Sequence, residues 1–275
     1  MHIRKIAVAV SSALLLLFAG SMVEGAKIVV PRDFKSIHTA LGEVEEGDTV
    51  FVLKGIYYEN IALQDNVVLL GEDMHATIID GGRNAPCVIG ANGAVLSHFT
   101  ITNGTTGILC RNTRPIISEN LIINNKGAGI KAQISLPDIS NNIILNNGWT
   151  GIFLESARGT KTTIDHNVVA DNEYCGIFCA HSTEVFIHNN MITGNKQYGL
   201  FISSGSRKTR IVNNNFFNNR MQVNAGAVAN ETNTWLLPVY TAPLWPTYNY
   251  HIKQESQCRG RGENGTDIGL MPEAE

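Results

Sequence analysis

The chain has 275 residues, 44% of them hydrophobic, and a formal net charge of −3 at pH 7. This length and apolar content suffice to bury a sizeable core, and the charge excludes a generally basic nucleic-acid-binding protein. We expect residues 26–275 to form one elongated domain.

Residues 1–25 have the pattern of a secretory signal peptide. His2, Arg4 and Lys5 precede an apolar run over 6–19 that is short for a membrane span. Small residues allow cleavage after Ser21 or Gly25, and an uncleaved anchor helix is the alternative. No cysteine follows the run, which argues against a lipid anchor. The sequence therefore predicts a periplasmic or extracellular protein with no membrane span after cleavage.

Residues 26–82 are expected to contain an N-terminal cap and the first coils of a repeat fold. The apolar residues of the segment 33–44 have helical spacing, and Asp33 is placed to cap the first turn. They are Phe34, Ile37, Ala40, Leu41 and Val44. A short amphipathic helix here would cover the open end of the repeats.

Repeats occupy residues 83–224. A glycine followed by isoleucine or leucine recurs with spacings of 22, 22, 25 and 23 residues, at Gly107, Gly129, Gly151, Gly176 and Gly199. A period in the twenties built from short apolar runs is typical of a solenoid, because one unit cannot bury its apolar side alone.

Two series of asparagines follow the same period. One is Asn103, Asn125, Asn147, Asn172, Asn195 and Asn219; the other is Asn120, Asn142, Asn167, Asn190 and Asn214. Asparagine tolerates tight turns, and stacked copies can hydrogen-bond to one another. We therefore predict an asparagine ladder with a structural role.

Between the asparagines each coil carries two short apolar alternations. Runs of three to five residues with a period of two predict strands, because helices need a 3.6-residue period and greater length. Equivalent residues in neighbouring coils should then lie about 4.8 Å apart.

Residues 225–275 are expected to form an irregular C-terminal tail and closing segment. The stretch 234–250 breaks the repeat and contains Trp235, Trp245 and three prolines. It predicts a tail that packs along the coils or over the last one, the alternative being an aromatic ligand-binding arm.

The five cysteines show no disulfide pattern. Cys175 and Cys179 flank one short strand, so they should lie roughly 13 Å apart, beyond bridging range. Cys110 and Cys179 occupy inward positions and are interpreted as apolar fillers, whereas Cys87 could approach Cys110. Cys258 has no evident partner, and the odd count leaves at least one free thiol in a monomer.

Alternation predicts a column of outward aromatic side chains. The second position after each repeat glycine is outward, which places Phe153, Phe178 and Phe201 on consecutive coils. The column is interpreted either as a platform for a sugar ring or as the surface on which the tail packs, and tail packing is favoured.

Longer turns follow the last three repeat glycines, and they are expected to form a functional rim. Its basic residues are Arg158, Lys161, Arg207, Lys208 and Arg210, beside His181 and Glu184 and the outward residues Glu155, Asp165 and His188. Arginine binds carboxylates in bidentate fashion, so the rim would suit a uronic-acid polymer. Solvated loop charge is the alternative.

Asp165 and His188 occupy equivalent outward places in adjacent coils and should be near contact. Such a pair could act as a general acid or base, with the carboxylate orienting the imidazole and raising its pKa. A structural role is the favoured interpretation, because the repeat generates such strings easily.

The repeats resemble those of right-handed parallel β-helix proteins of the pectin-lyase-like superfamily, a group that includes NosD-like periplasmic proteins. The segments 33–37, 46–50, 54–60 and 77–81 are similar to that group's opening coils, and 250–258 with 265–269 to its closing segment. The resemblance implies an all-β, single-stranded right-handed parallel β-helix with a short N-terminal capping helix. It implies no particular reaction, because the fold serves lyases, hydrolases, esterases, epimerases and binding proteins.

The catalytic elements of the superfamily are largely missing. The segment 164–167 is only a little like the Ile-Asp-His element of pectate lyases, and the acidic oxygens for a calcium-dependent lyase do not converge. Methionine or histidine clusters with copper-ligand spacing are also lacking. We expect no cofactor, calcium being required only by a lyase.

Two functions from different classes remain, with a purely structural role as a third. The first is binding of a carbohydrate or acidic polysaccharide, such as a cell-surface glycan, by a monomer without catalysis. Its predicted ligand-binding residues are Phe153, Phe178, Phe201, Arg158, Arg207, Lys208 and Arg210. The second is a polysaccharide lyase, glycoside hydrolase or epimerase whose catalytic residues would be Glu155, Asp165, His181 and His188.

Overall fold

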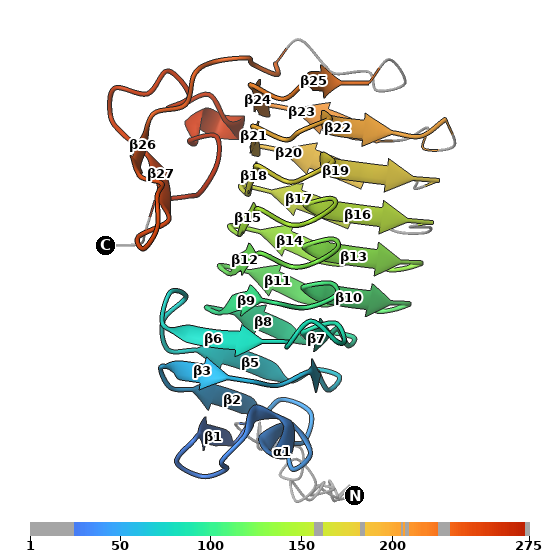
Figure 1. Cartoon of the computed structure of the whole chain (residues 1–275), viewed down its shortest axis with the longest axis vertical. Coiled ribbons are helices and arrows are strands. Elements are labelled where there is room, and N and C mark those ends of the chain that lie inside the picture. The colour runs from blue at the N-terminus through green and yellow to red at the C-terminus, as the bar shows by residue number, and fades with distance from the viewer. Residues whose placement is uncertain are drawn as a thin grey trace, which may run out of the picture.

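The computed structural model describes residues 25–156, 162–181, 185–204, 206, 209–224 and 232–272. The predicted signal peptide up to residue 24, and Arg158, Lys161, Glu184, Arg207 and Lys208 of the predicted rim, lie outside them. The chain winds through three parallel sheets, here named A, B and C, and each successive coil stacks on the one before (Figure 1). This is the predicted right-handed parallel β-helix.

Each coil after the first contributes one strand to each sheet, and the first coil contributes only β1. Sheet A consists of β1 (Lys27–Val30), β2 (Thr49–Val52), β5 (Val68–Gly71), β8 (Val95–Ser97), β11 (Ile116–Ser118), β14 (Asp138–Ser140), β17 (Thr162–Asp165), β20 (Val185–His188) and β23 (Arg210–Val212). Sheet B consists of β3 (Gly55–Tyr57), β6 (Thr77–Asp80), β9 (Thr100–Thr102), β12 (Leu121–Ile123), β15 (Ile143–Leu145), β18 (Val168–Ala170), β21 (Met191–Thr193) and β24 (Asn215–Phe217). Sheet C consists of β4 (Ile61–Ala62), β7 (Val88–Ile89), β10 (Ile108–Arg111), β13 (Ile130–Gln133), β16 (Ile152–Glu155), β19 (Cys175–Ala180), β22 (Tyr198–Ile202) and β25 (Met221–Val223).

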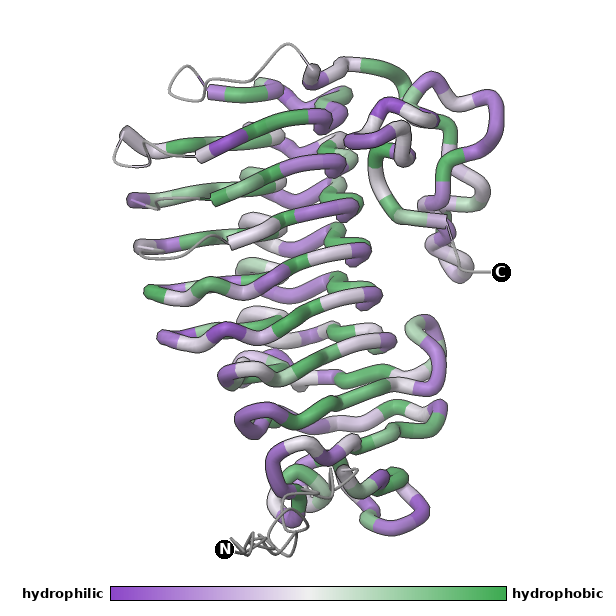
Figure 2. Tube along the Cα trace, turned by 180° about the vertical axis from the view of Figure 1, so that it is seen from behind, coloured by the Kyte–Doolittle hydropathy of each residue, from purple (hydrophilic) through white to green (hydrophobic). Residues whose placement is uncertain are grey.

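A coil therefore has three strands, where the sequence predicts two apolar alternations. A corner residue with positive φ divides the first apolar alternation into one strand of sheet A and one strand of sheet B. Glu119 (φ 57°) and Asn141 (φ 54°) are two such residues. The inward side chains of all three sheets meet in one core, which includes Ile117, Ile122 and Ile130 at 0% exposure. Apolar and polar residues alternate along the coils accordingly (Figure 2).

The structure confirms the asparagine ladder and resolves it into two. At the corner between sheets A and B, the side-chain Nδ2 of each asparagine donates to Oδ1 of the next coil's asparagine, through Asn120, Asn142, Asn167, Asn190, Asn214 and Asn233. A second ladder between sheets B and C runs through Asn125, Asn147, Asn172, Asn195 and Asn219. The tight turn itself falls on the residue before each ladder asparagine, for example Asn124 and Asn146.

Asn103 departs from the predicted series. It has a positive φ of 57° and donates to Asp80, while the next residue, Gly104, takes the ladder position and donates its N–H to Asn125 Oδ1. Asn103 is therefore equivalent to Asn124, one residue earlier than the sequence predicts.

The repeat glycines are required by close approach to the second ladder. A Cβ on Gly129 would lie 2.8 Å from the carbonyl oxygen of Gly151 and 2.9 Å from Nδ2 of Asn147. Both distances are shorter than side chains tolerate, so the glycine column and the ladder depend on each other.

A short helix covers the first coil, as predicted, but a different residue caps it. Helix α1 spans Ile37–Leu41, buries Ile37, Ala40 and Leu41, and is capped by Ser36, whose hydroxyl accepts from Thr39 N–H. The Asp33 carboxylate instead accepts from Val29 N–H and pairs with Arg32.

The described part of the C-terminal segment, residues 232–272, packs on sheet B and not on the phenylalanine column, which corrects the favoured interpretation. It contains the hairpin β26 (Tyr240–Ala242) and β27 (Asn249–Ile252) and the short 3₁₀ helix η1 (Glu263–Gly265). Tyr250, Ile252, Cys258, Ile268 and Leu270 pack on the outer face of sheet B, against apolar side chains of β12, β15, β18 and β21. Trp235 and Trp245 remain 52% and 77% exposed.

All five cysteines are buried and free. Burial raises the pKa of Cys87, Cys110, Cys175 and Cys179 to about 12, so these thiols stay neutral at physiological pH. Cys87 donates to the carbonyl oxygen of Thr102 at 3.0 Å rather than bridging to Cys110.

Candidate functional site

Six aromatic side chains form one continuous strip on the outer face of sheet C, here named the aromatic strip. The predicted column is in register, since Phe153 pairs with Phe178 and Phe178 with Phe201. Their ring centroids lie 5.1 and 4.8 Å apart in edge-to-face contact. A second column from the neighbouring turns, Trp149, Tyr174 and Tyr198, runs beside the first.

The two columns are joined by further ring contacts. Trp149 lies 4.8 Å from Phe153, and Tyr198 lies 5.0 Å from Phe201. Phe153 is buried at 7% exposure, whereas the other five rings are half-buried. Mutual packing therefore fixes the rings while leaving a partly accessible aromatic surface over β16, β19 and β22.

Polar groups border the N-terminal end of the strip. Lys131 on β13 places its ammonium 5.6 Å from the centroid of the Phe153 ring. Arg111 donates to Gln133, and Gln133 donates to Glu155 at 2.7 Å, so these outward side chains form a chain across β10, β13 and β16. The border supplies two cations and one carboxylate beside an apolar surface.

Arg210, the described basic residue of the predicted rim, does not border the strip. It lies on β23 of sheet A, with its guanidinium 4.7 Å from the centroid of Phe186. Phe186 in turn stacks on the His188 ring at 3.9 Å.

Asp165 and His188 make the predicted contact at the corner between sheets A and B. The two residues are paired in the β17–β20 register, and Asp165 Oδ1 lies 3.3 Å from His188 Nδ1. The same oxygen lies 2.7 Å from His166 Nδ1 and accepts from Asn189 Nδ2 at 3.0 Å. Residues 165, 166, 188, 189 and 263 are here named the corner cluster.

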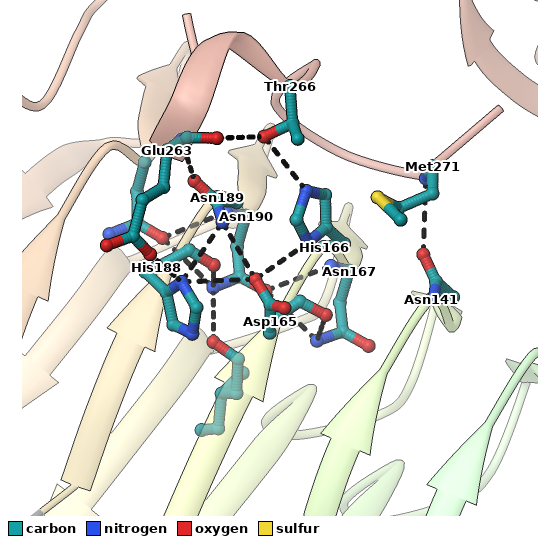
Figure 3. Close-up of polar contacts among 12 residues, drawn as sticks. Asn141, Asp165, His166, Asn167, His188, Asn189, Asn190, Glu263, Thr266 and Met271 are labelled. Atoms are coloured by element: carbon teal, nitrogen blue, oxygen red, sulfur yellow. Dashed lines mark hydrogen bonds and ion pairs between the residues drawn. The ribbon is translucent and has the colours of Figure 1, made fainter.

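The corner cluster holds the last part of the chain, residues 258–272, here named the strap (Figure 3). Glu263 N–H donates to Asn189 Oδ1 at 2.8 Å, and Glu263 Oε2 lies 3.4 Å from His188 Nδ1. His166 Nε2 lies 3.3 Å from the Thr266 hydroxyl, and Gly269 N–H donates to the Asn189 carbonyl. The arrangement anchors a segment, and it buries both imidazoles to less than 10% exposure.

The charge state of Asp165 follows from these contacts. Burial raises its pKa, but the hydrogen bond from His166, the charges of His166 and His188, and the bond from Asn189 together bring the pKa below its ordinary value. Asp165 is therefore ionised at neutral pH and acts as a hydrogen-bond acceptor for the cluster.

The structure does not gather the four predicted catalytic residues. Glu155 ends β16 in sheet C, and His181 follows the paired end of β19, where its N–H donates to Ser203 Oγ. Asp165 and His188 lie at the far end of the sheet A strands, beside the strap and not beside the predicted rim. The four residues thus form two separate groups.

Several residues of both sites were not predicted from the sequence. Trp149, Tyr174 and Tyr198 stand one or two residues before a repeat glycine, a regularity that would have predicted the second aromatic column. His166 and Asn189 precede ladder asparagines, so their corner position could have been inferred. Glu263 carries no comparable signal, because its contact joins residues 74 positions apart.

Comparison with known proteins identifies the fold family. The family model described as "Periplasmic copper-binding protein (NosD)" matches residues 41–250. No curated protein matches the chain. Within the described residues, no helix is long and apolar enough to cross a membrane.

One solved structure shares the fold, and two others show a weaker similarity. The periplasmic alginate epimerase AlgG has a TM-score of 0.53 at 16% identity, with 77% of this chain and 54% of that chain covered. This chain thus spans about half the length of that epimerase. The A-module of the Azotobacter vinelandii mannuronan C-5 epimerase AlgE6 has a TM-score of 0.42 at 18% identity, covering 70% and 72%, and carrot pectin methylesterase 0.39 at 11%, covering 76% and 86%. At these identities the similarity concerns the fold alone.

The described residues do not fit a copper centre. Copper sites need imidazole, thiolate or thioether donors that converge on one point. Across the described ranges, no three histidine, cysteine, aspartate or glutamate side chains are grouped so as to hold a metal ion. His166 and His188 both direct Nδ1 to Asp165, and the five cysteines are buried as free thiols. Copper is therefore assigned no role.

Proposed function

Because the chain belongs to the family described as periplasmic copper-binding protein (NosD), we propose that it works in the periplasm, as a non-catalytic protein that binds an acidic polysaccharide along the aromatic strip. The observation that carries this proposal is the strip itself, six packed rings spanning three coils of one sheet. A partly exposed aromatic surface that runs over three coils is typical of a binding site.

The geometry of the strip suits an extended polymer. Equivalent rings on neighbouring coils repeat at about 4.8 Å along the solenoid axis, a rise close to the length of one sugar residue in an extended chain. The C–H faces of the sugar rings can therefore lie over successive aromatic side chains, where they meet ring edges as well as ring faces because neighbouring rings are in edge-to-face contact. Because the strip is rigid before binding, little side-chain entropy is lost on association.

Charge at the border of the strip favours an acidic chain. Lys131 and Arg111 lie toward its N-terminal end, where the two cations outnumber the one carboxylate, Glu155, so a uronate carboxylate there would meet a net positive charge. The attraction should weaken as salt is added, because exposed charges are screened.

Binding requires no convergence of catalytic groups, which supports this role over the enzymatic alternative. A lyase, hydrolase or epimerase centred on Glu155, Asp165, His181 and His188 would need these side chains around one sugar residue. Glu155 ends a strand of sheet C, whereas Asp165 ends a strand of sheet A. Asp165 and His188 also serve the strap.

The proposal is tested by affinity measurements with polygalacturonate, alginate and a neutral glucan, at low and high salt. We expect Phe178→Ala and Tyr174→Ala each to weaken binding of the acidic polymers at least about tenfold, since one ring's stacking contact is worth about 1.4 kcal/mol. Lys131→Ala should reduce the salt dependence. Trp245→Ala, which removes an exposed ring outside the strip, should leave the affinity unchanged.

Two outcomes would overturn the proposal. One is no binding of any polysaccharide by the folded wild-type protein. The other is an equal loss of affinity in Trp245→Ala and Phe178→Ala. Release of unsaturated or reducing products by the wild-type protein would contradict the non-catalytic part.

A further inference from the structure

The corners between sheets A and B place one polar column on the surface of the solenoid. Between the β8–β9 corner and the β20–β21 corner, its members are the residues with positive φ: His98, Glu119, Asn141, His166 and Asn189. Each residue stands directly before a ladder position. Its side chain therefore points away from the core, whereas the side chain at the ladder position points inward. We name this set the corner column.

The strap occupies the upper three members of the corner column. Glu263 and Gly269 bind Asn189, Thr266 contacts His166, and Met271 N–H donates to Asn141 Oδ1 at 3.1 Å. The lower two members, Glu119 and His98, line a groove.

The groove has a volume of about 620 Å³ and walls from three parts of the chain. One wall is the loop Asp73–His75 ahead of β6; the opposite wall is His251 with Leu270, Met271 and Pro272. Figures 1 and 2 show the C-terminal segment lying above this loop on the same side of the solenoid. The volume is in the range of small-molecule sites, about 300–1,000 Å³.

Hydrogen bonds hold the polar groups of the groove in place. His98 Nε2 lies 3.0 Å from Glu119 Oε2, and His98 Nδ1 lies 2.7 Å from the Ser97 hydroxyl. His251 is fixed between Asn249 Oδ1 and the Met271 carbonyl. The loop is tied down by Thr100, which donates to the Met74 carbonyl, and by the Lys54–Asp73 pair at 3.0 Å. A ligand would thus meet a largely preorganised site.

The hydrogen-bonding capacity of the groove exceeds what these contacts use. Glu119 is half-exposed, and among the described residues its carboxylate is contacted by His98 alone, although a carboxylate accepts about four hydrogen bonds. The His75 ring makes no hydrogen bond to another described residue, and Asn141 retains its amide donors. Sugar hydroxyls both donate and accept, so they match this mixture of carboxylate, imidazole and amide groups.

The charges and the apolar surface of the groove indicate which class of sugar it can bind. Two carboxylates, Asp73 and Glu119, line the groove, and the one permanent cation paired with them is Lys54. A uronate would be repelled, whereas a neutral or amine-bearing sugar would not. Met74, Leu270 and Pro272 supply an apolar wall for the C–H face of a sugar ring.

We propose that this groove is a second saccharide site, separate from the aromatic strip, that binds a neutral or amine-bearing sugar between the corner column and the strap. The walls from Leu270 to Pro272 belong to the strap, so an occupied groove should also hold the strap more firmly.

The test uses the full mature chain with cellobiose, the glucosamine disaccharide and digalacturonate as probes, followed by calorimetry and by NMR of the histidine side chains. We expect the first two sugars to bind, with shifts of the His98 and His251 resonances, and digalacturonate to bind at least tenfold more weakly. Glu119→Gln and His75→Ala should each weaken the binding at least fivefold. His75 is an exposed loop residue, so its removal should leave folding intact.

Two controls separate this site from the strip. His38→Ala removes an exposed histidine of helix α1 and should change nothing, and Phe178→Ala should weaken polymer binding but leave groove binding unaltered. The proposal is overturned if neither cellobiose nor the glucosamine disaccharide binds at millimolar concentration. It is also overturned if groove variants bind like wild type, or if digalacturonate binds as tightly as cellobiose.

Discussion

Single asparagines connect each coil of this protein to the next. Asn142 is fully buried; its Nδ2 donates to Ile117 O, Ser140 O and Asn167 Oδ1, and its Oδ1 accepts from Asn120. The left-handed backbone conformation lies instead on the residue before each ladder asparagine, such as the exposed Asn146 (φ 53°). Thus the ladder asparagine forms hydrogen bonds with buried backbone groups, and the residue before it makes the turn.

This division predicts opposite effects of two asparagine substitutions. Asn142→Ala should lower the free energy of unfolding by about 3 kcal/mol or more, because it leaves several buried polar groups unpaired. Asn146→Gly should be neutral or slightly stabilising, because glycine adopts positive φ without strain. Denaturant unfolding of both variants checks this, and equal midpoints would contradict the assignment of roles.

The position of the strap is set by side chains of the coils on which it lies. It covers apolar residues of sheet B, and its polar anchors are members of the corner cluster and Asn141. Asp165 organises the cluster, and its charge is stabilised by His166, His188 and Asn189, with Glu263 on the far side of His188. Docking of the strap should therefore depend on the ionisation of Asp165.

Acid should loosen the strap before it unfolds the coils. The pKa of Asp165 is lowered in the folded protein from 3.8, so its contribution is complete above that value and is lost as the pH falls through the lowered folded pKa. Hydrogen exchange of the strap amides, measured between pH 5 and pH 2 at roughly unit steps, should accelerate in this acid range while amides of β12 and β15 stay protected. Asp165→Asn should show fast strap exchange already at pH 5; slow exchange in this variant would contradict the role of Asp165.

At the scale of the whole molecule, the sequence predicts the coils well and the C-terminal segment poorly. The spacing of Gly129 and Asn142 repeats because every coil meets the same neighbours above and below, so local patterns carry the fold. The strap instead meets a few coils through contacts that do not repeat, such as Met271–Asn141, which joins residues 130 apart. One available signal was the run Ile143–Leu145, whose three consecutive apolar residues indicate a strand buried on both faces.

The candidate sites were predictable to the same extent. The phenylalanine column follows from the period, and the Asp165–His188 contact follows from equivalent positions in adjacent coils. The role of each site depends on which surface the strap covers. The strap covers the corner and part of sheet B, whereas the aromatic strip lies on sheet C. That distinction needs tertiary contacts, which a periodic pattern does not contain.

The most direct measurement is a crystal structure of the protein with a bound oligogalacturonate, the ligand that the groove should reject. We predict that the sugar rings lie over β16, β19 and β22 along the solenoid axis, stacked on Phe178, Tyr174 and neighbouring rings of the strip, with a carboxylate near Lys131. An oligomer bound instead at Asp165 and His188, with the strap displaced, would contradict the proposed function and restore the enzymatic alternative.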